Sequence, residues 1–198
     1  MFQHRLQELA QCVTECTVQK DGSVVTVDQG LTHAATMLKM TKGVVYVIGN
    51  GGSAGIASHF SNDLMKALHI PSQTLYDSNL MTCLSNDLGY EEVFSFPLEK
   101  LLKPTDVLVA ISSSGKSPNI LKAAEVAKKR GVPLITLSGF LPTNPLRTLG
   151  HLNFWIDRAD YGLVESAHFI LLHSLVDLWK PLTGKMAHVQ NDRAFAAH

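Results

Sequence analysis

Two segments of this sequence place an apolar strand pattern, a glycine- or serine-rich loop and a helix pattern in direct succession. In the first, the loop Gly49–Ser53 follows apolar residues 44–48, and in the second, the loop Ser112–Ser117 follows apolar residues 107–111. Nearly continuous apolar strands are typical of a parallel sheet that is covered by helices on both faces. Such loops aim backbone N–H groups and hydroxyls at one point, where the next helix N-terminus favours an anion. The pattern predicts an anion site at the carboxyl ends of parallel strands.

Strand and helix patterns alternate along the chain from residue 44 onward. Strands are predicted near 44–48, 72–76, 107–111, 133–137 and 153–156, and helices near 53–68, 79–88, 91–102, 118–130 and 163–180. This alternation with short loops predicts an α/β fold, a doubly wound, flavodoxin-like sandwich around a five-stranded parallel sheet.

Two further helices are predicted ahead of this alternation, over residues 2–18 and 28–40, with Asp28 as a possible N-cap. The tripeptide Asp21-Gly22-Ser23 between them is a turn signal. The apolar faces of these helices need a partner, and a neighbouring subunit is one candidate. We therefore divide the chain into a helical pair for oligomerisation (1–42), a main domain (43–182) and a polar tail (183–198).

Composition restricts the function classes. The 17 acidic and 17 basic residues cancel, so nothing favours nucleic acid or a membrane surface as partner. The three cysteines form no disulfide framework, and Cys12 and Cys16, four residues apart, are interpreted as packing residues rather than as a metal pair. With no secretory signal and no apolar run long enough to span a bilayer, we expect a cytoplasmic protein.

The loops do not match nucleotide-binding motifs. No glycine lies five residues before Gly115, so the serine loop is not a Walker-type P-loop, and Ala54 stands where a dinucleotide fingerprint needs its third glycine. Several hydroxyls and N–H groups around a helix start suit a phosphate monoester. The alternative interpretation is a serine-rich turn that only caps the helix near 118–130.

Three motifs together resemble the sugar isomerase (SIS) domain family: Gly49–Ser53, Ser85-Asn86-Asp87 and Ile111–Ser117. The similarity runs from about residue 44 to residue 179, and it looks most like the phosphoheptose isomerases within that family. The resemblance implies aldose–ketose isomerisation of a phosphorylated sugar, with sedoheptulose 7-phosphate and a manno-heptose 7-phosphate as the expected pair. It also implies a homotetramer with sites shared between subunits.

The resemblance also assigns binding residues. Phosphate is expected to contact Ser53, Ser112, Ser114 and Ser117, with Ser113 nearby. The sugar is expected to contact Asn50, Gly51, Gly52, Asn86, Asp87 and Glu165. Lys116 is interpreted as a solvated loop lysine.

A metal site is implied as well. His59 and Asp63 lie four residues apart on a predicted helix and so share a face. In the family, such a pair joins two residues of the last helix in a zinc site, and the matching positions here are Glu165 and His173. Zn²⁺ or another divalent ion is therefore expected on these four residues. Asp63 replaces the family's usual glutamate, and Glu165 replaces its usual glutamine.

A rival histidine lies on the same predicted helix. Glu165 and His168 are three residues apart, and both His168 and His173 sit in an apolar stretch where a core histidine is ordinary. For the reaction, Asp63 is the expected base, or shares that role with metal binding, and His173 is the expected acid, through an enediolate.

Two alternatives remain open at this point. One is a non-catalytic SIS protein that docks a partner such as a replication initiator, and the other is a different sugar-phosphate isomerase or a sugar-phosphate sensor. The docking relatives lack the acid and the late histidine, so Asp63 and His173 favour the enzyme. Glu165, which departs from the family's usual glutamine, is the feature that supports a different sugar-phosphate isomerase or a sensor.

Overall fold

The predicted alternation of strands and helices is present in the computed structural model, which describes residues 1–182. Five parallel strands form the centre of the sheet in the order β4-β3-β5-β6-β7. They are β3 (Val45–Ile48), β4 (Ser72–Gln73), β5 (Val107–Ser112), β6 (Leu134–Gly139) and β7 (Leu152–Ile156). This is the flavodoxin-like order, whose switch point lies between β3 and β5. The predicted fold class is confirmed.

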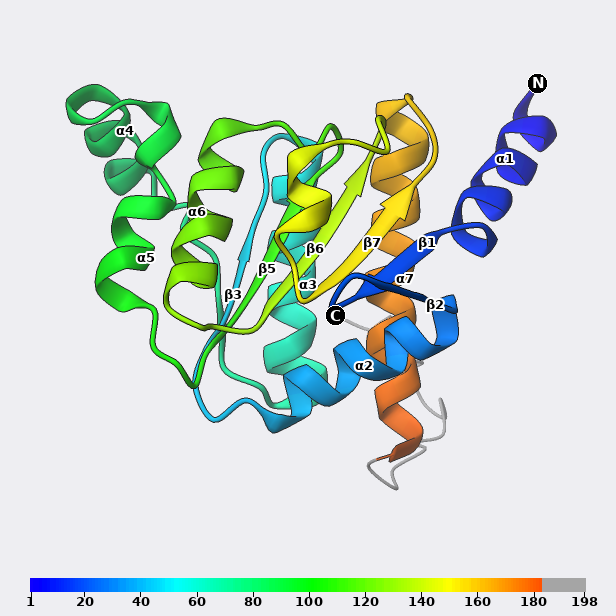
Figure 1. The fold of residues 1–198 in the computed structure, drawn as a ribbon, viewed down its shortest axis with the longest axis horizontal. Coiled ribbons are helices and arrows are strands. Elements are labelled where there is room, and N and C mark those ends of the chain that lie inside the picture. The colour runs from blue at the N-terminus through cyan, green and yellow to red at the C-terminus, as the bar shows by residue number, and fades with distance from the viewer. Residues whose placement is uncertain (183–198) are drawn as a thin grey trace, which may run out of the picture.

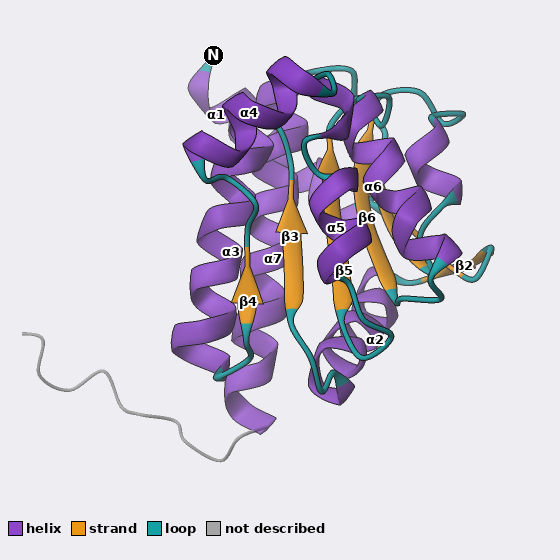
Figure 2. Cartoon of the chain, turned by 90° about the vertical axis from the view of Figure 1, so that its left-hand side faces the viewer, coloured by secondary structure: helices purple, strands orange, loops and turns teal. Residues whose placement is uncertain are grey.

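Helices cover both faces of the sheet, so the chain forms three layers (Figures 1 and 2). One face is packed against α1 (Phe2–Thr14), α2 (Val27–Met40), α3 (Gly52–Leu68) and α7 (Tyr161–Leu182). The other is packed against α4 (Ser78–Asp87), α5 (Ser95–Leu101) and α6 (Pro118–Lys129). There are also two short 3₁₀ helices, η1 (Tyr90–Glu92) and η2 (Pro145–Thr148). The single helix predicted near 91–102 is therefore divided into η1 and α5.

The sheet has seven strands rather than the predicted five. A hairpin of β1 (Thr17–Lys20) and β2 (Ser23–Val25) adds to the edge of β7, with β1 antiparallel to it. The predicted helix over 2–18 is wrong beyond Thr14 for this reason. Asp21 and Gly22 form the hairpin loop with φ values of 47° and 83°. Positive φ at both loop residues is what a type I′ hairpin turn requires, and Asp-Gly is a favoured pair for it.

The N-terminus of α2 also differs from the prediction. Thr26, not Asp28, is the N-cap: its hydroxyl accepts a bond from the Gln29 N–H at 3.2 Å, and the Gln29 side chain accepts one from the Thr26 N–H at 3.0 Å. This reciprocal capping box satisfies two N–H groups at once, whereas a cap at Asp28 offers only one bond. Asp28 lies in the first turn, where its charge favours the helix dipole.

The N-terminal segment is joined to the rest of the chain by packing and by charge. Cys12 and Cys16 are buried at 4% and 6% exposure, which confirms their interpretation as packing residues. Arg5 of α1 pairs with Asp160, just before α7, at 2.6 Å. No described helix is long and apolar enough to cross a membrane. The division at residues 42 and 43 stays a prediction, and the tail 183–198 lies outside the described residues.

Asp106 fastens the start of β3 to the turn before β5. It is 2% exposed, and its carboxylate accepts bonds from the backbone N–H groups of Val44 (2.8 Å) and Lys103 (2.7 Å). We expect Asp106→Ala to lower the free energy of unfolding by about 3 kcal/mol, because both bonds involve a charged acceptor. Urea denaturation measures this loss, with exposed Asp28→Ala as the control. A loss no larger than that of the control contradicts the assignment.

Candidate active site

The two predicted loops meet at the switch point of the sheet. A cleft of about 240 Å³ opens there, at the carboxyl ends of β3 and β5. Its lining consists of Asn50, Gly51, Gly52, Ser53, Ile111, Ser112, Ser113, Ser114, Ser117, Tyr161 and Glu165. Nine of the eleven expected phosphate- and sugar-contact residues are thus brought together, since only Asn86 and Asp87 are missing from that lining.

The helices α3 and α6 begin at the cleft, and neither has a side-chain cap at its N-terminus. Gly51 precedes α3 with φ 54° and ψ −123°, and neither it nor Ser117 before α6 makes a side-chain capping bond. Ser117 instead accepts a 3.2 Å hydrogen bond from the hydroxyl of Ser112. The first N–H groups of a helix have no intrahelical acceptor, so the uncapped start of α3 leaves donors for an anion. In α6 fewer donors remain, because Pro118 has no N–H and the Ile120 N–H is bonded to Asn119 Oδ1. The cleft therefore offers N–H groups and hydroxyls together.

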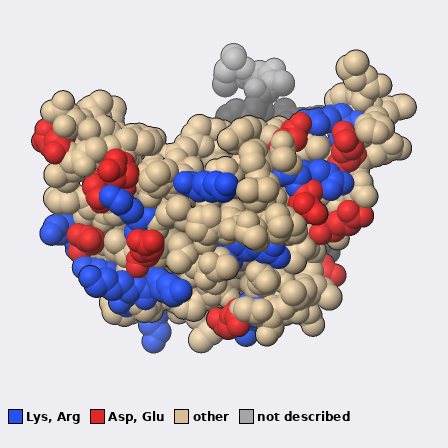
Figure 3. Space-filling model, turned by 45° about the horizontal axis from the view of Figure 1, so that its top comes forward, with Lys and Arg blue, Asp and Glu red and all other residues tan. Residues whose placement is uncertain are grey.

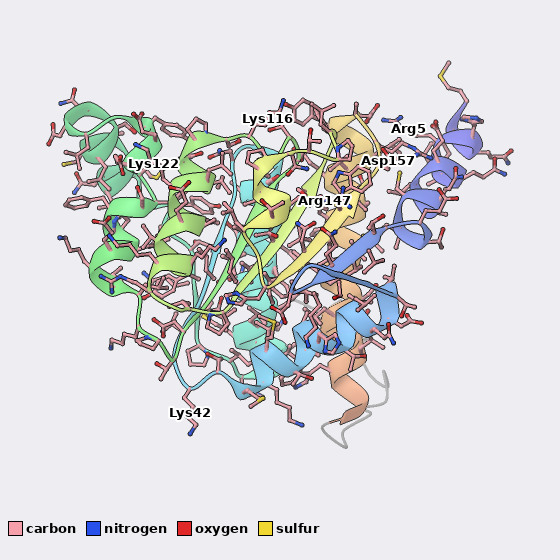
Figure 4. All side chains as sticks on the ribbon, viewed as in Figure 1. Arg5, Lys42, Lys116, Lys122, Arg147 and Asp157 are labelled. Carbon is pink, nitrogen blue, oxygen red and sulfur yellow. The ribbon has the colours of Figure 1, made fainter. Side chains whose placement is uncertain are left out.

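No basic side chain is among the described residues that line the cleft. Lys116 is exposed at the carboxyl end of the sheet, in the loop that follows β5 (Figure 4), as expected for a solvated loop lysine. On the surface at this end of the sheet, acidic and basic side chains are mixed and form no continuous patch of one charge (Figure 3). Local dipoles, rather than net charge, are what can hold a phosphate here.

Asn86 and Asp87 lie outside the cleft lining. They are exposed at the end of α4, where the Asn86 amide donates to the Asp87 carboxylate at 2.8 Å. Their sugar contacts stay a prediction. The same segment reaches the site through Tyr90, whose hydroxyl donates to the Asn50 side chain at 3.1 Å. Sequence reasoning missed Tyr90, Asn119 and Tyr161, although Asn119 stands only two residues beyond the serine loop.

A seam between α3 and α7 leads away from the cleft. His59 lies seven residues after Gly52, two turns along α3, so both are on one face together with Asp63. At the cleft end of the seam, the carboxylate of Glu165 packs so tightly on Gly52 that a Cβ there would overlap it. Further along, the rings of His59 and His173 are 4.8 Å apart.

His59, Asp63 and His173 form a compact triad at that far end of the seam. Their ligand atoms all lie within 4.8 Å of one another. The Asp63 carboxylate is 3.4 Å from His59 Nε2 and 3.7 Å from His173 Nδ1. All three side chains are partly exposed, at 49%, 24% and 40%. A substrate or an ion therefore has access to them.

The triad fits a zinc-like ion in donor type and spacing. Two ligands of a tetrahedral zinc with bonds of about 2.1 Å lie about 3.4 Å apart, close to the separations observed here. Two imidazoles and a carboxylate are an ordinary donor set for such an ion. Glu165, expected as a further ligand, is not part of the triad, because it sits at the level of Gly52 near the start of α3. The metal role of the other three stays a prediction.

His168 is a core residue and not a rival for the site. It is completely buried, and its Nε2 lies 3.1 Å from the backbone carbonyl oxygen of Ser138 in β6. Burial lowers the pKa of His168 to about 4, although the bond to Ser138 acts in the opposite direction. A neutral imidazole that donates from Nε2 to this carbonyl accounts for the contact.

This buried histidine predicts a loss of stability in acid. Between pH 6.5 and 4 the unfolded chain binds a proton at His168 and the folded chain does not, so stability falls as the pH falls. Between pH 7 and pH 4.5 we expect the free energy of unfolding to decrease by about 2–3 kcal/mol less in His168→Gln than in wild type. Urea denaturation at pH 7 and pH 4.5 measures it, with exposed His4→Gln as the control. Equal pH dependence in wild type and His168→Gln refutes the prediction.

Comparison with known proteins identifies the family. The SIS domain family matches residues 6–139 of this chain. The chain belongs to the SIS domain family. A phosphoheptose isomerase of Helicobacter pylori (strain Shi470) is 34% identical over 142 residues, which cover 69% of this SIS-domain chain and 73% of that protein. The SIS-domain chain is accordingly an enzyme, a sugar-phosphate isomerase.

Solved structures share the SIS fold. The phosphoheptose isomerase of Neisseria gonorrhoeae superimposes with a TM-score of 0.77 at 24% identity, over 91% of this chain and 95% of that one. The NanR protein of Vibrio vulnificus, solved in complex with ManNAc-6P, superimposes with a TM-score of 0.70 at 16% identity, over 92% of this chain and 61% of that one. At these identities the likeness establishes the fold of the SIS-domain chain and not its substrate.

Proposed function

We propose that this enzyme interconverts sedoheptulose 7-phosphate and an aldose heptose 7-phosphate. One observation carries the proposal: the α3–α7 seam has a phosphate-type cleft at one end and the triad of His59, Asp63 and His173 at the other. A sugar phosphate has the same two ends, an anion to be held and a carbonyl to be rearranged.

The length of the seam supports a long substrate. Seven residues of α3 separate Gly52 from His59, a rise of about 10 Å at 1.5 Å per residue. The carbonyl of a 2-keto heptose is five carbon–carbon bonds from C7, and at about 1.5 Å per bond this chain spans about 6–7 Å when extended. The phosphate ester and the reach of the side chains account for the remainder. A short triose phosphate cannot contact both ends of the seam.

The triad supplies groups for proton transfer. Isomerisation requires a base that removes the proton from the carbon beside the carbonyl, and an acid that moves a proton between the two oxygens. We assign the base to Asp63, alone or together with a metal-binding role, and the acid to His173. A divalent ion held by His59, Asp63 and His173 supplies Lewis-acid polarisation of the carbonyl when it is bound. The serine loop keeps the phosphate fixed throughout and so orients the carbonyl end.

Substrate comparison tests this proposal. Purified protein loaded with Zn²⁺ is incubated with sedoheptulose 7-phosphate and, separately, with fructose 6-phosphate and dihydroxyacetone phosphate. We expect the heptose to give a kcat/KM at least about tenfold above the shorter sugars, because only it reaches both ends of the seam. Preference for a shorter sugar points to a different sugar-phosphate isomerase. Binding without turnover of any sugar points to a sensor or a docking protein.

Metal binding by the triad is tested separately. We expect His59→Ala and His173→Ala each to weaken Zn²⁺ binding about 100-fold or more in a competition titration, because each removes one of three protein ligands. His4→Ala, an exposed histidine of α1, serves as the control. Zinc affinity that is equal in all four proteins contradicts the site.

A homotetramer is part of the same proposal. α1 leaves the large apolar side chains of Phe2 and Leu6 exposed at 74% and 49%, although most of the other apolar helix faces are packed. Light scattering is expected to give a mass near four subunits. A mass near one subunit counts against the arrangement.

A further inference from the structure

Three polar side chains beside the cleft form a hydrogen-bonded group that we call the Asn50 cluster: Asn50, Asn119 and Tyr90. Asn50 follows β3, Asn119 lies in the first turn of α6, and Tyr90 begins η1. The amides of Asn50 and Asn119 exchange two bonds, from Nδ2 to Oδ1 in each direction, both of 2.9 Å. Tyr90 Oη donates to Asn50 Oδ1 at 3.1 Å. The cluster thus links the two loops of the site and η1.

The backbone fixes the orientation of both amides. Asn119 is 1% exposed, and its Oδ1 accepts a 3.0 Å bond from the backbone N–H of Ile120. Because a backbone N–H can only donate, the oxygen of the Asn119 amide must lie on that side. The reciprocal pair then requires the Nδ2 of Asn50 to face the Asn119 oxygen. Rotation of either amide by half a turn breaks both bonds at once.

This orientation limits what Asn50 can offer to a ligand. Its Oδ1 already accepts two bonds, one from Asn119 and one from Tyr90, and a carbonyl oxygen has two lone pairs. Its Nδ2 carries two hydrogens, of which Asn119 takes one. Asn50 lines the cleft, so its remaining contribution there is one N–H donor and no acceptor.

We propose that Asn119 and Tyr90 are positioning residues that hold Asn50 as a donor to an oxygen of the sugar. The inference rests on the proposed function for its ligand, a sugar phosphate. The serine loop already supplies hydroxyls and N–H groups for the phosphate, which leaves the Asn50 donor for the sugar portion. Asn119 and Tyr90 therefore govern sugar affinity and not phosphate affinity.

Calorimetry with two ligands tests this division. Binding of sedoheptulose 7-phosphate and of inorganic phosphate is measured for wild type, Asn119→Asp and Tyr90→Phe. Asp keeps the size of the side chain but turns an oxygen toward Asn50 Oδ1, which breaks the reciprocal pair. We expect sugar-phosphate affinity to fall about tenfold in Asn119→Asp and about threefold in Tyr90→Phe. Inorganic phosphate affinity is expected to stay unchanged in Tyr90→Phe. In Asn119→Asp, whose new charge lies in the first turn of α6, it is expected to fall less than sugar-phosphate affinity.

Other outcomes overturn the inference. Equal losses for the two ligands mean that the cluster only holds the loops together, and unchanged sugar-phosphate affinity means that it does not act on the sugar. A wild type that binds the sugar phosphate no more tightly than inorganic phosphate also refutes it. Asn79→Asp, an exposed change on α4, controls for the change in net charge. Tyr90→Phe, which removes one exposed hydroxyl, decides the question if Asn119→Asp fails to fold.

A double variant shows whether the effect passes through Asn50. In an Asn50→Ala background we expect Asn119→Asp to cause no further loss of sugar-phosphate affinity, because the donor that it positions is gone. Additive losses contradict the proposed role. Turnover is followed on the same samples. A wild type that binds the heptose phosphate without converting it refutes the isomerase proposal while these affinity ratios still decide the role of the cluster.

Discussion

Asp63→Asn is expected to lower kcat at least about 100-fold, because general-base catalysis of proton transfer contributes on that order. Asn keeps the shape of the side chain but cannot accept the proton at neutral pH. Asp63 is not among the residues that line the cleft, so binding of inorganic phosphate should remain as in wild type. Initial rates with sedoheptulose 7-phosphate and calorimetry with inorganic phosphate measure the two effects.

Asp63→Glu is the matched control, since it retains a carboxylate at this position. We expect this variant to keep more activity than Asp63→Asn, and Asp28→Asn on the exposed part of α2 to keep all of it. Wild-type turnover in Asp63→Asn removes Asp63 from the mechanism. Loss of both turnover and phosphate binding shows instead that the change disturbs the cleft.

Removal of hydroxyls from the serine loop is expected to affect phosphate binding most. Ser112 and Ser117 share a hydrogen bond and line the cleft. A hydrogen bond to a charged group contributes about 1.5–3 kcal/mol, so each change to Ala should raise KM about tenfold or more, and the double variant about 100-fold. The inhibition constant of inorganic phosphate should rise by the same factors, because inorganic phosphate is expected to contact the same hydroxyls.

Stability separates this effect from damage to the fold. The Ser117 side chain makes no capping bond to α6, so Ser117→Ala should leave the melting temperature within about 2 °C of wild type. Ser78→Ala on exposed α4 is the control for activity. If phosphate inhibits wild type and the double variant equally, the serine loop is not the phosphate site.

Local patterns allowed the best predictions. The two strand–loop–helix segments determine their own backbone, and the switch point then brings their ends together, which is why the cleft residues of both loops were predicted. The placement of His59 and Asp63 on one helix face could be predicted from the helical repeat alone. The hairpin before α2 was missed because its strands have four and three residues, although its Asp-Gly turn was read correctly.

Residues whose role depends on a neighbouring element were not predictable. His168 and His173 are five residues apart, about 140° around a helix, so one faces the sheet and the other faces α3. Periodicity alone does not tell which is which. The level of Glu165 beside Gly52 follows from how α7 packs on α3. The pairing of Asn119 with Asn50 joins residues 69 positions apart, and no local signal marks it.

NMR of sedoheptulose 7-phosphate in D₂O tests the isomerase proposal most directly. With the Zn²⁺-loaded protein we expect an aldose heptose 7-phosphate to appear, carrying deuterium at C2. The base removes a proton from C1 of the ketose and exchanges it with D₂O, and the enediolate then takes up a deuteron at C2, the former carbonyl carbon. In the Asp63→Asn protein, both product formation and deuterium exchange should be far slower than in wild type. A ketose that stays unconverted and free of deuterium while bound to the wild-type protein contradicts the proposed isomerase.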